Sequence, residues 1–109
     1  MVQAYPDDAN GGVLRSMAAS GADMTIPYDV DFEHVFPKLD AAEAFGKRAA
    51  KTARRVELSE YNGASGYYWQ VRVVVSMTPG HADIGRVEAE LETLAEAHGG
   101  RSDGWGILH

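Results

Sequence analysis

Two stretches of this sequence alternate between apolar and polar residues, and this pattern constrains the fold more than any other feature. They span residues 29–36 and 67–77. Because successive side chains of a β-strand point to opposite faces of a sheet, each stretch predicts a strand with one buried and one solvated face. Weaker alternation over 54–61 and 103–108 predicts two further strands. The residues expected on the buried face of the two strongest strands are Val30, Phe32, His34, Phe36, Trp69, Val71, Val73 and Val75.

Apolar residues recur at helical spacing in three other segments, which predict helices. Asp40 lies three residues before Glu43, a capping pattern that places the start of one helix at Asp40. Gly99 and Gly100 suit a left-handed C-cap that ends another helix. The predicted helices span residues 10–20, 40–53 and 84–98.

The order of these elements predicts the fold class. After an N-terminal helix, the elements follow the order β-α-β-β-α-β, which is the ferredoxin-like order. We therefore expect an α+β two-layer sandwich in which two helices cover one face of a four-stranded antiparallel sheet and leave the other face open. The 109 residues suffice for one core, so we expect a single domain over 1–109, with residues 1–9 loosely ordered.

Charge and composition exclude several classes of function. A count of 10 basic against 16 acidic residues gives a formal net charge of −6, and a negative field repels the phosphate backbone of nucleic acids. The sequence has no cysteine, which rules out disulfide bonds, thiol catalysis and cysteine-ligated metals. No apolar run reaches the roughly 18 residues of a membrane span, and no signal peptide is recognisable. We therefore expect a cytoplasmic protein that binds neither nucleic acid nor membrane.

The open face of the predicted sheet carries three acidic residues of the first strand, Asp29, Asp31 and Glu33. One interpretation is a solvated face on which Arg72 lies opposite an acid. The other is a docking surface for a basic segment of another protein. An RNA-recognition surface is rejected, because three acids repel phosphate and a single tyrosine, Tyr68, offers no platform for stacked bases.

Two charged runs on the predicted helices each allow two interpretations. Glu88, Glu92 and Glu96 recur every four residues and share one helix face, which is either solvated or a docking surface for a basic partner. A basic run ends the second predicted helix, where the helix dipole favours cations. If that helix continues, the run forms a stripe that could hold RNA. Its members are Lys47, Arg48, Lys51, Arg54 and Arg55.

The sequence contains no constellation typical of catalysis or of metal binding. None of the four histidines pairs with another at the i, i+4 spacing of a helical metal site, and no serine lies in a G-x-S-x-G turn. We expect no catalytic residue, no metal and no cofactor. The alternative is a homodimeric small-ligand binder or small enzyme that uses the open sheet face, which a pocket lined by His34, Tyr67 or Tyr68 would favour.

The most unusual local string is Asp103-Gly104-Trp105-Gly106, which follows a helix that carries Leu94-Ala95-Glu96. This combination resembles the C-terminal half of the regulator of ribonuclease E activity B (RraB) family, although Ser102 stands where tyrosine is usual. The resemblance covers residues 10–108 in the order of elements and is specific over 84–106. It implies a ferredoxin-like fold and a non-enzymatic inhibitor that binds ribonuclease E and alters RNA processing and decay.

The leading hypothesis is therefore an acidic, non-catalytic domain, expected to be a monomer, that docks onto a protein partner such as ribonuclease E or another basic protein segment. Trp105, between two glycines, is either a core anchor or, if it is exposed, an energetic hot spot for a partner. The candidate partner-binding residues are Asp29, Asp31, Glu33, Glu88, Glu92, Glu96, Asp103 and Trp105.

Overall fold

The computed structural model describes residues 9–63 and 66–108. Within these residues the helices and strands follow one another in the predicted order. The expectation that residues 1–9 are loosely ordered falls outside the described residues, except at Ala9, which already belongs to the first helix. The elements are α1 (Ala9–Ala19), β1 (Tyr28–Phe36), α2 (Leu39–Ala49), β2 (Arg55–Glu60), β3 (Trp69–Met77), α3 (His81–Ala97) and β4 (Arg101–Leu108).

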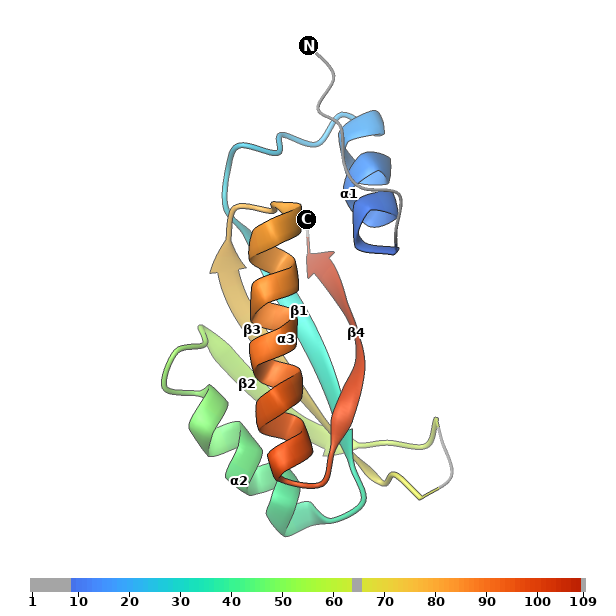
Figure 1. Cartoon of the computed structure of the whole chain (residues 1–109), viewed down its shortest axis with the longest axis vertical. Helices are drawn as coiled ribbons and strands as arrows, with labels where there is room; N and C mark the ends of the chain where they lie inside the picture. Colours follow the sequence, from blue (N-terminus) through green and yellow to red (C-terminus); the bar gives the residue numbers. More distant parts are fainter. Residues whose placement is uncertain (1–8, 64–65, 109) are drawn as a thin grey trace.

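The four strands form one sheet in the order β2-β3-β1-β4. All three neighbouring pairs are antiparallel, so β1 and β3 are the central strands and β2 and β4 are the edges. Helices α2 and α3 lie across one face of the sheet, and α1 stands beside the C-terminal end of β4 (Figure 1). This arrangement confirms the predicted α+β fold and is consistent with a ferredoxin-like sandwich.

The core lies between the sheet and the two helices that cover it. Val30, Phe32, Val71 and Val73, which alternation placed on the buried face, are all at most 1% exposed. Phe45 of α2 packs among them, and its ring centroid lies 5.1 Å from that of Phe36. The prediction of which side chains of β1 and β3 face the helices is therefore confirmed.

Helix α3 ends as the glycine pair predicts. Gly99 has a φ of +80°, a conformation that costs glycine little because it has no Cβ. Its N–H donates to the carbonyl of Glu96, and the N–H of Gly100 donates to that of Ala95 at 2.8 Å. These two bonds satisfy the last carbonyl groups of the helix and turn the chain directly into β4.

The predicted bounds of α2 are wrong at both ends. Lys38, not Asp40, is the N-cap residue, and it makes no side-chain capping hydrogen bond. The helix ends at Ala49 instead of Ala53, because the N–H groups of Lys51 and Thr52 bond carbonyls three residues back in a tightened turn. The N–H of Arg54 then donates to Val74 of β3 at 2.8 Å, which draws the chain into the sheet.

Two strand starts also differ from the prediction. Strand β3 begins at Trp69 rather than at residue 67, because its partner β1 ends at Phe36, directly before Pro37. Tyr68 therefore lies in the loop between β2 and β3, where its side chain is 61% exposed. Strand β4 begins at Arg101, earlier than the predicted residue 103.

His34 is a buried histidine on the helix-covered side of β1, as its parity predicts. Its side chain is 1% exposed, and its ring centroid lies 4.9 Å from that of Phe45. Neither ring nitrogen has a hydrogen-bond partner. Burial lowers the pKa of His34 to about 4, because the charged ring would lose its hydration and the backbone at Phe32 offsets only part of that loss.

This histidine predicts a pH dependence of stability. The unfolded chain binds the proton near pH 6.5 and the folded chain only near pH 4, so stability is fully present above pH 6.5 and falls as the pH drops toward 4. The loss attributable to His34 reaches about 3 kcal/mol by pH 4. Urea unfolding of the wild type and of His34→Leu between pH 7 and pH 4 measures it. Equal pH slopes for the two proteins would contradict the prediction.

Candidate functional site

A β-bulge in β4 determines which of its side chains reach the open face. Phe32 of β1 pairs with Trp105, but His34 pairs with Ser102, so one residue of β1 lies opposite two residues of β4. The extra residue falls at Asp103-Gly104, where Gly104 has a φ of +107°, which suits glycine. The bulge switches the parity of the strand and places Arg101 opposite Val35 of the open face.

The centre of the open face is an arginine surrounded by three carboxylates. The Nη2 of Arg72 donates to Oε1 of Glu33 at 2.9 Å. Its Nε lies 3.6 Å from Oδ2 of Asp31, and its Nη1 lies 4.0 Å from Oε1 of Glu57. Asp31 is 8% exposed, so its carboxylate has little contact with water and pairs with the neighbouring guanidinium instead.

The acidic residues predicted on the open face are therefore all paired within the chain, with Asp31 and Glu33 sharing the single positive charge of Arg72. Asp29 lies 3.5 Å from Nε of Arg54, and Asp31 and Glu33 both pair with Arg72. This geometry favours the interpretation of a solvated, internally paired face. A basic partner would have to compete with existing ion pairs for these three carboxylates.

Some side chains of the open face are also less exposed to solvent than the alternation of residues predicts. Val35 and Val74 point to this side, yet both are 0% exposed. The neighbours of Val35 across the sheet are Gln70 and Arg101, and those of Val74 include Arg55. The alkyl stems of such long side chains cover apolar surface while their polar ends reach water.

The loop between β2 and β3 contributes aromatic side chains to one end of this face. The guanidinium of Arg101 lies 4.6 Å from the ring centroid of Tyr67, a cation–π contact. Tyr61 lies beside Asp103 of the bulge, and partial desolvation together with this carboxylate raises the pKa of the Tyr61 hydroxyl. The bulge thus brings Asp103 next to the loop, a contact for which the sequence gives no local signal.

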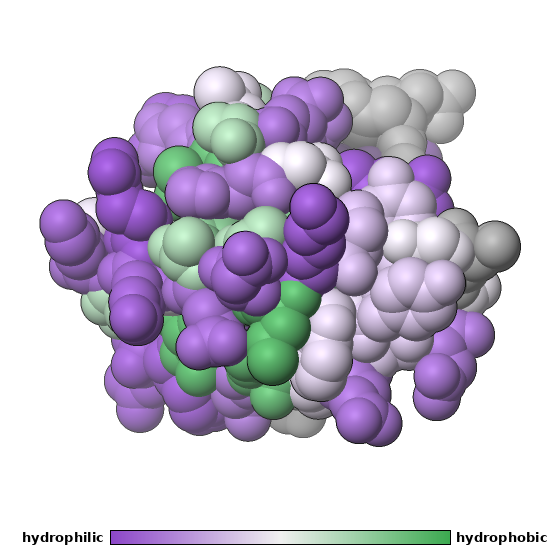
Figure 2. All heavy atoms as spheres, turned by 90° about the horizontal axis from the view of Figure 1, so that it is seen from below, coloured by the Kyte–Doolittle hydropathy of each residue, from purple (hydrophilic) through white to green (hydrophobic). Residues whose placement is uncertain are grey.

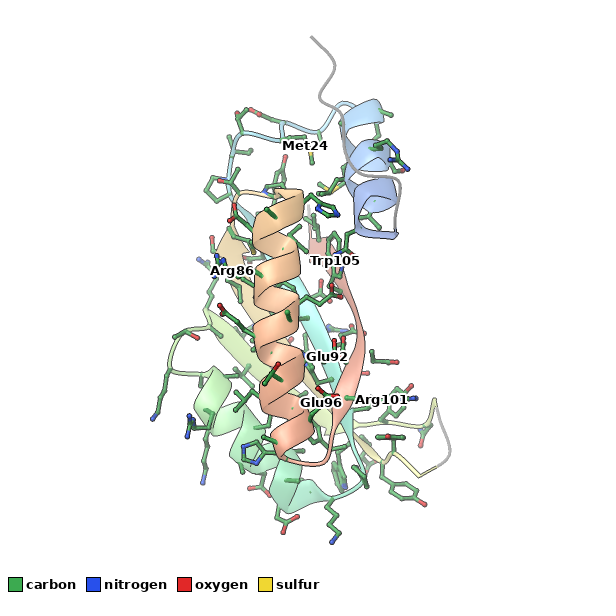
Figure 3. All side chains as sticks on the ribbon, viewed as in Figure 1. Met24, Arg86, Glu92, Glu96, Arg101 and Trp105 are labelled. Carbon is green, nitrogen blue, oxygen red and sulfur yellow. The ribbon has the colours of Figure 1, made fainter. Side chains whose placement is uncertain are left out.

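The three glutamates of α3 that were predicted to form a docking surface occupy different environments. Glu88 accepts a hydrogen bond from Nδ2 of Asn10 in α1 at 3.1 Å, so its carboxylate links two helices. Glu92 and Glu96 are exposed, and neither forms an ion pair with any of the described residues. Their side chains lie along the flank of α3 nearest β4 (Figure 3). We call this flank of α3, which carries Glu92 and Glu96, the acidic flank.

Trp105 is a half-buried residue that packs against the core and contacts α1. It lies on the helix-covered side of β4 opposite Phe32, as the core-anchor interpretation requires. Its indole Nε1 donates to Oδ1 of Asn10 at 2.7 Å. Asn10 therefore bridges Trp105 and Glu88 through one side-chain amide. Asn10 has no signal in the sequence, because its contact with Trp105 spans 95 positions and no periodic pattern marks it.

The basic run does not form the continuous helical stripe that an RNA-binding surface would need, since α2 ends at Ala49. Lys47 and Arg48 lie in the last turn of the helix. Arg54 and Arg55 lie beyond it, and their side chains pair with Asp29 and Glu57.

The described residues provide no support for a metal centre or for a deep pocket on the open face. Within 9–63 and 66–108, no group of three or more His, Cys, Asp or Glu side chains is arranged to hold a metal ion. One open-face cavity of about 280 Å³ is shallow and lies over β2 and β3, lined by Glu57, Leu58, Ser59, Gln70 and Arg72. None of the helices described is long and apolar enough to cross a membrane.

Comparison with known proteins decides the family. The family model described as "Regulator of ribonuclease activity B", RraB, matches residues 7–107. The chain belongs to the RraB family. The match extends well beyond the Asp-Gly-Trp-Gly string and includes every described strand and helix up to Ile107. As an RraB protein, the chain is related to regulators of ribonuclease activity.

Other comparisons add little. No curated protein matches the chain. Among solved structures, it is similar to a C-terminal segment of the alpha subunit of aIF2 from Pyrococcus abyssi, with 15% identity and a TM-score of 0.30. The alignment covers 90% of this chain and 58% of that structure. A likeness this low supports no conclusion about function.

The arginine at the centre of the open face predicts a stability difference between two similar substitutions. Arg72→Met leaves the nearly buried Asp31 without its counter-charge and should lower the free energy of unfolding by about 1–2 kcal/mol. Arg54→Met removes an exposed pair and should cost less than about 0.5 kcal/mol. Urea denaturation at pH 7 measures both. Equal losses would show that Arg72 has no special role in the fold.

A glycine in the bulge and a glycine in α3 should respond in opposite ways to substitution by alanine. Gly104→Ala places a Cβ in a backbone conformation that L-residues rarely adopt and should destabilise the fold by about 1–2 kcal/mol. Gly85→Ala lies within α3, with open space around the new methyl group, and should stabilise by up to about 1 kcal/mol. Thermal unfolding followed by circular dichroism distinguishes the two signs.

Proposed function

We propose that this chain is a non-catalytic, cytoplasmic regulator that acts as a monomer by binding a protein partner and thereby changes ribonuclease activity. The observation that carries the proposal is the RraB family match over residues 7–107. The family is one of regulators, and the partner that the local resemblance favours is ribonuclease E or another protein with a basic segment.

Among the candidate partner-binding residues, those of the acidic flank are best suited to bind such a partner. Glu92 and Glu96 are exposed and have no ion pair within the described part of the chain, so a basic side chain could bind them without breaking an existing pair. Asp29, Asp31 and Glu33 each have an arginine within 4 Å. Electrostatic attraction to exposed carboxylates would speed association and would weaken as salt screens it.

Trp105 and Glu88 have a supporting role in this proposal. Their shared contact with Asn10 links α1 to α3 and β4. This link lies one turn before Glu92 and supports the start of the acidic flank. Asp103, beside Tyr61 at the lower end of β4, adds a further carboxylate on the open-face side of the same edge.

A titration with purified ribonuclease E tests the proposal. The protein should bind at low salt and alter cleavage of an RNA substrate, and binding should weaken as salt increases. The double substitution Glu92→Gln/Glu96→Gln should raise Kd about tenfold. The matched control is Asp40→Asn/Glu60→Gln, which removes the same charge elsewhere and should bind normally.

Two outcomes would contradict this interpretation. If ribonuclease E does not bind at low salt, it is not the target. If both double variants lose affinity equally, net charge and not the acidic flank governs binding.

A further inference from the structure

The second surface of interest is an apolar groove between α2 and the edge strand β2. Its floor consists of Val56 and Leu58 of β2 and Val71 of β3. Gly46 lies above this floor, and a Cβ in its place would meet Val56 Cγ1 at 3.4 Å. The small side chains on this side of α2 thus leave a groove of about 270 Å³, whose lining is completed by Ala42, Glu43, Lys47 and Ala50.

The groove exposes apolar surface that the fold does not use. Leu58 points toward the helix layer, yet it is 42% exposed, because α2 covers only part of β2. Figure 2, seen from the lower end of Figure 1, shows hydrophobic side chains at the surface among hydrophilic ones. Within the described residues β2 pairs only with β3, so its outer backbone edge is open to an added strand.

The charges beside the groove have the opposite sign to the net charge of the chain. Lys47 lines the groove, and Arg48 and Lys51 lie at the same end of α2. All three are exposed, and none forms an ion pair within the described residues. The groove therefore ends in uncompensated positive charge on a protein whose formal net charge is −6.

The geometry points to this groove as a docking site for an extended, acidic and apolar segment of another protein. The segment would add to the free edge of β2 through main-chain hydrogen bonds. An apolar side chain would cover Leu58 and Val56, and carboxylates would approach Lys47 and Lys51. This second surface lies at the opposite edge of the sheet from the acidic flank and does not depend on the proposed function.

Other occupants fit the groove less well. Nucleic acid would meet the positive charges but would leave the apolar floor of the groove uncovered. A second copy of the chain would bring the same cations toward each other if its β2 paired with this one. The volume of the groove, about 270 Å³, lies just below the range of small-molecule pockets. It is large enough to hold one or two side chains of a bound segment.

Nuclear magnetic resonance titration of the full chain tests this inference. The probe is a synthetic peptide in which Asp and Leu alternate, and it should shift the backbone amide signals of Gly46, Val56 and Leu58. Leu58→Ser, at an exposed position that leaves the core intact, should raise the Kd of the peptide about tenfold. Lys47→Glu should raise it about fivefold.

Three controls separate the docking site from general attraction. Lys38→Glu changes the charge of α2 by the same amount at its other end and should leave the Kd within about twofold. The Glu92→Gln/Glu96→Gln variant should bind the peptide normally, since its changes lie on the acidic flank. A peptide with Ser in place of Leu should bind at least about tenfold more weakly.

The inference is overturned by any of three results. One is the absence of shifts at these amides at about 1 mM peptide, the weak limit of useful affinity. Another is a Lys-Leu peptide or a single-stranded RNA that binds the groove more tightly than the Asp-Leu peptide does. The third is concentration-dependent shifts of the same amides in the free protein, which would identify a second copy as the occupant.

Discussion

The alternating burial of the β1 side chains is the constraint on which the rest of the structure depends. Strand β1 is paired on both sides, so each of its residues must point either under the helices or onto the open face. Phe32 and His34 fill the core, while Asp31 and Glu33 lie on the reverse side against Arg72. A shift of one residue in register would bury these carboxylates beneath the helices and expose the aromatic rings.

The two edges of the sheet differ in charge. Around β4 lie the exposed carboxylates of α3, whereas around β2 lies an apolar groove with lysines at one end. The face between them is almost self-neutralised by its arginines. A family of regulators needs surfaces that recognise other molecules, and the two surfaces proposed above lie at the edges of the sheet and not at its centre.

The sequence predicts those helices and strands that are determined by residues close together in the chain. Alternation identified β1 and β3 and their buried residues, and the glycine pair at 99–100 identified the end of α3. Pairing between distant positions could not be predicted. The sequence of Asp103-Gly104 is compatible with a bulge or with close packing, and only pairing with β1 decides that Arg101 faces the open side. The ends of α2 were missed because its cap uses no side-chain hydrogen bond.

The link made by Asn10 has a consequence for motion. Helix α1 joins the sandwich through the buried side chains of Leu14 and Met17 and through one amide that holds both Trp105 and Glu88. Because α1 lies outside the two layers that enclose the core (Figure 1), it is the segment expected to undock first while the sheet stays folded. Undocking would free the indole of Trp105 and the carboxylate of Glu88 at the same moment. The exposed surface of the β4 edge would then be gated by a local opening of the amino-terminal helix.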